Sequence, residues 1–127
     1  MITSNLAFMC LAINIFYEAG IEPMEGKLAV ALVTMNRTKE SKTDVCSVVF
    51  QKKQFSWTTK SPPDIAGPNW AQSKIAANLV LQNSVVDFTH GATHYHADYI
   101  KPPKWAKNMT YCGKWGRHHL YKKRISS

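Results

Sequence analysis

Apolar residues near the start of the chain recur at the spacing of a helix. Leu6, Met9, Ile13 and Phe16 follow one another at steps of three or four residues, the period of an apolar helical face. Other apolar residues fill most of the remaining circumference, so the pattern predicts a helix that belongs in a core. Gly20 offers the place where this helix ends.

Three further segments show helical patterning. A second helix is predicted to open with Pro23 at its first position, a third to follow Asp44 as its N-cap, and a fourth to run from Asn69 to Val80. Their apolar residues at helical spacing are Leu28, Ala31, Leu32 and Met35 in the second, Val45, Val48 and Val49 in the third, and Trp70, Ile75, Ala76, Leu79 and Val80 in the fourth. Residues 51–68 contain three prolines and are predicted to form a loop.

The pattern changes after Val86. Residues 92–99 alternate and are rich in strand-forming side chains, as is the stretch around Leu120, and the two stretches are predicted to pair as a small antiparallel sheet. Neither a repeat nor a linker divides the chain. We therefore expect a mostly helical α+β fold, with residues 1–127 forming one domain.

Composition narrows the class of protein. With 127 residues, 45% of them apolar and 19% charged, the chain has the profile of a globular domain and not of a disordered one. The formal net charge of +8 at pH 7 favours polyanionic partners: nucleic acid, anionic lipid or anionic bacterial cell wall.

The three cysteines and the first residues give weaker indications. Cys46 and Cys112 are one conceivable disulfide pair, but the expectation is that all three cysteines, Cys10 included, are buried free thiols. The first residues carry no basic charge before the apolar run, so we expect neither an export signal nor a membrane span.

Among the eight carboxylates, Glu18 has the setting that general acids need. It ends an almost wholly apolar helix, where loss of water and the negative end of the helix dipole would both raise its pKa. The alternative is an ordinary glutamate that points into solvent. Glu22 and Glu25 are interpreted as favourable charges near the positive end of the next helix.

The order of motifs along nearly the whole chain resembles the SleB/CwlJ-type cell wall hydrolases, which include spore-cortex-lytic enzymes and related phage lysins. The matching stretches are Ile15-Phe16-Tyr17-Glu18-Ala19, Glu22-Pro23 with Glu25-Gly26, Ala29-Val30-Ala31 leading to Asn36-Arg37, Val45-Cys46 with Val48-Val49, Gln54-Phe55-Ser56-Trp57, Gly91-Ala92-Thr93-His94-Tyr95-His96, Trp105-Ala106 after Pro103, and Gly116 with His118 and Tyr121. The chain departs from the family pattern in the turn after Glu18, where Gly20 is displaced by one position and Ile21 precedes Glu22. The resemblance implies a lysozyme-like fold with Glu18 as the essential glutamate.

Two stretches are candidates for binding the glycan. Gln54, Phe55, Ser56 and Trp57 offer an amide, a hydroxyl and two aromatic faces to a sugar chain, although Trp57 is equally suited to closing the edge of the core. In the predicted strand, Thr93 and Tyr95 point to one side and His94 and His96 to the other, so one of the two pairs is expected to line the cleft.

A single suitable carboxylate favours a lytic transglycosylase. Ordinary glycosidases need two carboxylates, whereas a transglycosylase uses the C6 hydroxyl of the muramic acid as an internal nucleophile. We expect cleavage of the β-1,4 bond between N-acetylmuramic acid (MurNAc) and N-acetylglucosamine (GlcNAc), giving 1,6-anhydro products, with no metal or other cofactor. The expected partner is the peptidoglycan glycan strand, and the protein is expected to be a monomer.

Several alternatives stay open. A hydrolytic muramidase would need help from a second carboxylate such as Glu25. A zinc-dependent hydrolase would draw its ligands from His90, His94, His96, His118 and His119, and a basic module that only binds cell wall or nucleic acid is the third class. We expect a phage endolysin that is made in the bacterial cytoplasm and reaches the wall through a holin pore, without specific nucleic-acid binding.

Overall fold

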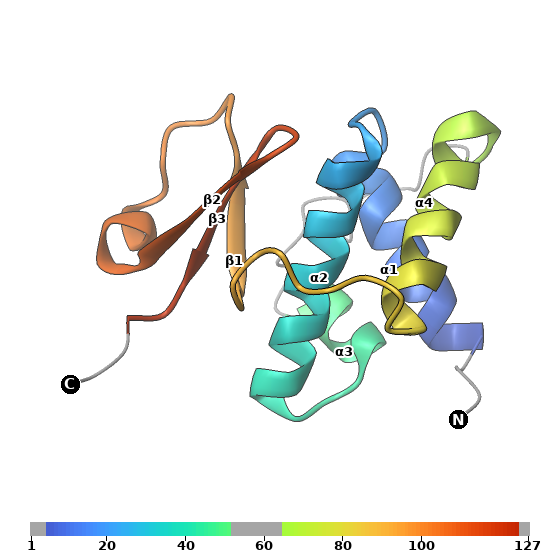
Figure 1. Cartoon of the computed structure of the whole chain (residues 1–127), viewed down its shortest axis with the longest axis horizontal. Helices are drawn as coiled ribbons and strands as arrows, with labels where there is room; N and C mark the ends of the chain where they lie inside the picture. The colour runs from blue at the N-terminus through green and yellow to red at the C-terminus, as the bar shows by residue number, and fades with distance from the viewer. Residues whose placement is uncertain (1–4, 52–64, 125–127) are drawn as a thin grey trace.

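The computed structural model describes residues 5–51 and 65–124, which form a helical body with a small sheet beside it (Figure 1). The four α-helices of the described residues are α1 (Asn5–Ala19), α2 (Met24–Ser41), α3 (Val45–Phe50) and α4 (Gly67–Leu81). The sheet contains β1 (His94–Ala97), β2 (Thr110–Trp115) and β3 (His118–Lys122), with the 3-10 helix η3 (Lys104–Asn108) before β2. Helix α2 packs against α1 and α4 and also meets β1 and β2, so it joins the two parts. This is the mostly helical α+β fold that the sequence predicts.

Helix α1 is buried on a different face from the one that its spacing predicts. Leu6 is 68% exposed and Met9 is 39% exposed, whereas Leu11 and Ile15 are fully buried. Nearly every position of this helix is apolar, so the period alone does not identify the face that α3 and α4 cover. Asn14 is buried as well, and its side chain donates a hydrogen bond to Thr34 Oγ1 of α2 (3.1 Å).

The other helix starts follow local signals. Pro23 is the N-cap of α2 and not its first residue, one position from the prediction. Asp44 caps α3 as predicted, because its side chain accepts a hydrogen bond from the amide of Ser47 (2.8 Å). Helix α4 begins at Gly67, with Pro68 in its first turn, so the end of the predicted loop 51–68 is helical.

The sheet is antiparallel, with strand order β1-β3-β2. The pairing of β1 with β3, which joins His94 to Tyr121 and Ala97 to His118, confirms the predicted sheet. Strand β2 was missed because a bulge between Tyr111 and Gly113 breaks its alternation. Gly113 has a φ of +126°, and a Cβ there would lie 2.9 Å from the Trp115 ring, so this position favours glycine.

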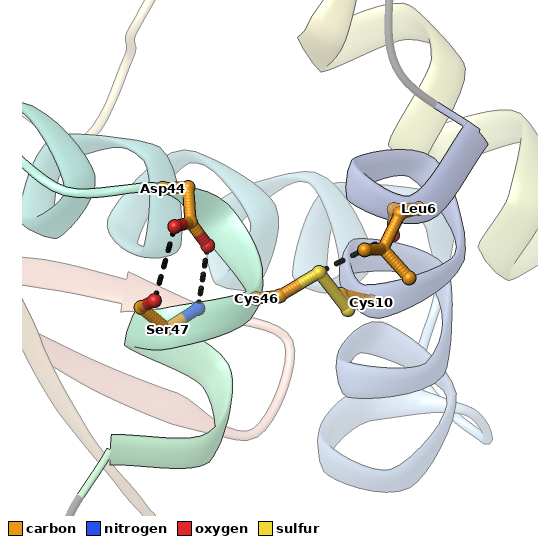
Figure 2. Close-up of a disulfide and its surroundings, with 5 residues drawn as sticks. All are labelled: Leu6, Cys10, Asp44, Cys46 and Ser47. Atoms are coloured by element: carbon orange, nitrogen blue, oxygen red, sulfur yellow. Dashed lines mark hydrogen bonds between the residues drawn. A yellow bond between two sulfur atoms is a disulfide. The ribbon is translucent and has the colours of Figure 1, made fainter.

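The cysteines differ from the prediction. Cys10 of α1 and Cys46 of α3 form a disulfide, with Leu6 beside it and the Asp44 cap two residues before Cys46 (Figure 2). Cys112, in β2, is the free cysteine. The prediction of free thiols was wrong because 36 residues separate the pair, and only the packing of α3 against α1 brings them together. No helix in the described parts of the chain is long and apolar enough to span a bilayer.

Candidate active site

A pocket of about 250 Å³ lies where α1 ends. Residues from α1, from the connection to α2, from the start of α4 and from two turns of the sheet region meet there. The described residues that line it are Phe16, Tyr17, Glu18, Gly20, Ile21, Glu22, Asn69, Tyr99 and Arg117. The residue that the sequence selects as the general acid is therefore part of a pocket wall.

Aromatic contacts fix the end of α1 that carries Glu18. The Phe16 ring meets the Trp70 ring of α4 edge to face, with centroids 5.8 Å apart, and meets the Tyr17 ring at 5.4 Å. Burial raises the pKa of Tyr17, so its hydroxyl stays protonated at neutral pH. Glu18 itself is partly buried, and its raised pKa stays a prediction.

Tyr95 of β1 joins the sheet to this end of α1. Burial raises its pKa well above the ordinary value, and the negative charge of Glu18 raises it further. The opposing influences are the charge of Arg37 and a contact with the side chain of Asn14. A neutral phenol therefore lies within electrostatic reach of Glu18, although it is not part of the pocket wall.

Glu22 is the second carboxylate of the pocket, and it is buried against the sheet. Its Oε1 accepts a hydrogen bond from the backbone amide of Arg117 (2.7 Å), and its Oε2 lies 3.0 Å from His118 Nδ1, within hydrogen-bond distance. A Cβ on Gly116 would lie 2.3 Å from Oε1, so the turn between β2 and β3 needs glycine there. Lys27, also buried, donates to the backbone carbonyl of Glu22.

This surrounding corrects the interpretation of Glu22 as a favourable charge at the start of a helix. The side chain is only 4% exposed and holds the turn between β2 and β3 against the beginning of α2. Gly116 and His118 were both part of the family motif. The motif indicates that these two residues matter, but no pattern in the neighbouring sequence shows that they contact Glu22.

Arg117 and Tyr99 are pocket residues that sequence reasoning missed. The Arg117 guanidinium carbon lies 5.0 Å from the centroid of the Tyr99 ring, within the range of a cation–π contact. Its Nε is 3.3 Å from Asp98 Oδ1. Lys114 Nζ lies 3.0 Å from Asp98 Oδ2. The hydrogen bond from Lys114 and the charges of Lys114 and Arg117 lower the pKa of the Asp98 carboxyl, while desolvation opposes them.

The sequence-predicted binding residues fall into two groups. Gln54, Phe55, Ser56 and Trp57 lie outside the described residues. Thr93, His94, Tyr95 and His96 are described, and none of them lines the pocket around Glu18, so their role in binding stays a prediction.

The alternation along β1 is as predicted. Tyr95 packs against the core, while His94 and His96 meet the Trp105 ring, with centroids 5.4 and 6.0 Å apart. His96 Nε2 is also hydrogen-bonded to the hydroxyl of Tyr121 (2.9 Å). The imidazoles thus belong to an aromatic cluster with Trp105.

A zinc site, the alternative from the sequence, would need at least three ligating side chains close together. Within residues 5–51 and 65–124, no three His, Cys, Asp or Glu side chains come together as a metal site. His118 is instead paired with Glu22.

Comparison with known proteins gives the family. The family model described as Cell Wall Hydrolase matches residues 21–121, a segment that begins three residues after Glu18. No curated protein matches the chain.

Two solved structures share the fold. The catalytic domain of the germination-specific lytic transglycosylase SleB from Bacillus anthracis has a TM-score of 0.75 at 24% identity, over 94% of this chain and 97% of that one. The catalytic domain of the Bacillus cereus SleB protein has a TM-score of 0.74 at 24% identity, over 94% of this chain and 91% of that one. Because the family model extends over most of the sequence, the match confirms what the motif order predicts: the chain belongs to the family of cell wall hydrolases.

Proposed function

We propose that this protein cleaves the β-1,4 bond between MurNAc and GlcNAc in peptidoglycan as a lytic transglycosylase, with Glu18 as its acid and base. The observation that carries the proposal is the difference between the two pocket carboxylates. Glu18 lines the pocket at the end of α1, whereas Glu22 is bound by His118 and by the Arg117 amide. Glu22 is thereby committed to the turn between β2 and β3, and Glu18 is the pocket carboxylate that we assign to proton transfer.

The reaction needs Glu18 in two protonation states. Protonated Glu18 first donates its proton to the glycosidic oxygen, and the bond between that oxygen and C1 of MurNAc breaks. The C6 hydroxyl of the same sugar then attacks C1, and the Glu18 carboxylate takes up the hydroxyl proton. The products are a 1,6-anhydro ring and a GlcNAc hydroxyl, and Glu18 returns to its starting state.

A hydrolytic muramidase is less well supported by the pocket. An inverting enzyme needs a second carboxylate to activate water, and a retaining one needs it as nucleophile. Glu25 is exposed in the first turn of α2 and is not a lining residue of the pocket. In addition, the structurally similar Bacillus anthracis domain is described as a lytic transglycosylase.

Mass spectrometry of digested peptidoglycan tests the proposal. Wild-type protein should release anhydro-muropeptides, and Glu18→Gln should lower the rate by about 10² to 10⁴, the usual contribution of general acid–base catalysis. Glu25→Gln is the matched control and should keep wild-type products and rate. Products with a reducing-end MurNAc would show hydrolysis instead, and undiminished release by Glu18→Gln would refute the role of Glu18.

The disulfide supports a place of action outside the cytoplasm. Disulfides persist mainly in oxidising compartments, and the Cys10–Cys46 bond joins two helices of the catalytic body. We extend the proposal to a phage endolysin that reaches the wall through a holin pore. Expression with and without a holin tests this role: lysis that depends on the holin supports it, and lysis that needs no holin contradicts it.

A further inference from the structure

Arg117 occupies a position in the pocket that the cleavage reaction does not use. It stands in the turn between β2 and β3, lines the same pocket as Glu18, and has 52% of its side chain exposed. A permanently charged group therefore faces the place where the glycan must lie.

The Arg117 side chain is held in position by neighbours at both ends. Glu22 fixes its backbone amide (2.7 Å), Asp98 binds its Nε (3.3 Å), and the Tyr99 ring lies 5.0 Å from the guanidinium carbon. Lys114 Nζ lies 3.0 Å from the other carboxylate oxygen of Asp98, Oδ2, and so fixes the Asp98 side chain. Because the position is set before a ligand arrives, less conformational entropy is lost when the guanidinium binds one.

The two terminal nitrogens of the Arg117 guanidinium, the Nη atoms, are the donors available to a ligand. The contact with Asp98 uses Nε, and no residue in the described parts of the chain bonds to either Nη atom. Two parallel N–H donors of an arginine match the two oxygens of a carboxylate. An arginine that is anchored through Nε and open at both Nη atoms is thus suited to an anionic ligand.

We propose that Arg117 binds a carboxylate of peptidoglycan beside the scissile bond and so selects chains that contain muramic acid over chains of GlcNAc alone. This inference rests on the proposed function and names the substrate feature that the same site recognises. Muramic acid provides the carboxylate in two ways: its lactyl group carries one when the stem peptide is absent, and the stem peptide carries its own when present. GlcNAc has neither.

Binding measured without turnover tests the inference. The inactive Glu18→Gln protein is titrated with soluble glycan strands, once with their carboxylates intact and once after the carboxylates are converted to amides. Adding Arg117→Gln should weaken binding of the intact strands about 10-fold or more, the range for a hydrogen bond to a charged group. It should leave binding of the amidated strands unchanged.

The matched control is Arg124→Gln, which removes the same charge from the exposed end of the chain after β3. This variant should weaken binding of intact strands much less than Arg117→Gln does. If Arg117→Gln unfolds the turn, Arg117→Lys, which keeps the charge but lacks the fork, replaces it and should also bind intact strands more weakly.

Two preparations of the strands separate the sources of the carboxylate. A loss confined to amidase-stripped strands assigns the contact to the lactyl group, and a loss confined to peptide-bearing strands assigns it to the stem peptide. Equal losses on intact and amidated strands would overturn the inference. Because binding is measured in a Glu18→Gln background, this result is independent of whether Glu18 performs the chemistry.

Discussion

At the scale of single residues, Glu18 and Glu22 line the same pocket but have different neighbours. A charged group that is buried must be paired, because its loss of water is otherwise uncompensated. Glu22 meets this demand with His118 and the Arg117 amide, so its carboxylate has a structural function: it holds the turn that presents Arg117.

Replacing Glu22 tests that function. Glu22→Ala leaves His118 buried without its partner, and we expect the free energy of unfolding to fall by about 3–5 kcal/mol. Chemical denaturation of wild type and variant measures the difference. Glu25→Ala, three residues further on and exposed, is the control and should change stability by less than about 0.5 kcal/mol. Equal effects of the two substitutions would show that the buried pair adds nothing.

The sequence singles out Glu18 by its local setting but does not reveal the surroundings of Glu22, for a physical reason. The setting of Glu18 is local, since the apolar residues around it belong to its own helix. The partners of Glu22 lie 95 and 96 residues further along the chain, and no local pattern shows that a distant turn will bury it. Arg117 and Tyr99 were missed for the same reason.

At the scale of elements, the helices are more predictable than their contacts. Asp44 and Pro23 mark helix starts by local chemistry that is visible in the sequence. The buried face of α1 and the disulfide from Cys10 to Cys46 depend on which helices pack together, which the apolar period alone does not determine. Strand β2 was missed because its bulge at Gly113 disturbs the period that identifies strands.

The disulfide should contribute strongly to the stability of the helical body. It joins residues 36 apart, and closing a loop of that size stabilises a fold by about 3–4 kcal/mol in the chain-entropy model. We expect Cys10→Ser with Cys46→Ser to lower the free energy of unfolding by about this amount. Denaturation with and without reductant measures it, because reductant should destabilise the wild type but not the double variant. Cys112→Ser, which removes the free cysteine, is the control. Reductant should destabilise this variant as much as it destabilises the wild type.

The histidines of the sheet predict how stability depends on pH. Burial and the charge of Arg37 lower the pKa of His94, with Lys123 acting in the same direction and Glu40 against it. Burial, His96, Lys114 and His118 lower the pKa of His119, and Asp98 opposes them. Below the ordinary value of 6.5, the unfolded chain takes up these protons more readily than the folded protein, so stability falls as pH falls.

Melting temperatures between about pH 8 and pH 5 check this dependence. The wild type should lose stability as pH falls through about 6.5 towards the lower folded pKa values. His94→Gln with His119→Gln should lose less over the same interval. His90→Gln, an exposed position in the connection before β1, serves as the control. If the melting temperature of the double variant falls with pH as steeply as that of the wild type, His94 and His119 are not the source of the pH dependence.

The pocket exists only at the scale of the whole molecule. Its wall combines the end of α1, Asn69 of α4, Tyr99 after β1 and Arg117 between β2 and β3. Figure 1 shows how α2 stands between the sheet and the other helices, so the Glu22 contact at its start ties the sheet to the helical body. The sequence predicts both parts separately, whereas their juxtaposition is a property of the complete fold.

The net charge of +8 is a property of the whole molecule, and the attraction that it causes should depend on salt. An anionic wall attracts the protein over roughly a Debye length, which shrinks from about 10 Å at 0.1 M salt to about 3 Å at 1 M. We therefore expect the rate on insoluble peptidoglycan to fall as salt rises through this range, while the melting temperature changes little. Replacing Lys101, Lys104 and Lys107, which are exposed around η3, by glutamine should lower the rate at low salt and flatten the salt dependence. Short soluble glycans with amidated carboxylates are the control substrate, since they carry no charge for the field to act on. A salt dependence as steep on that substrate as on the wall would show that salt does not act through the attraction between the positive protein and the anionic wall.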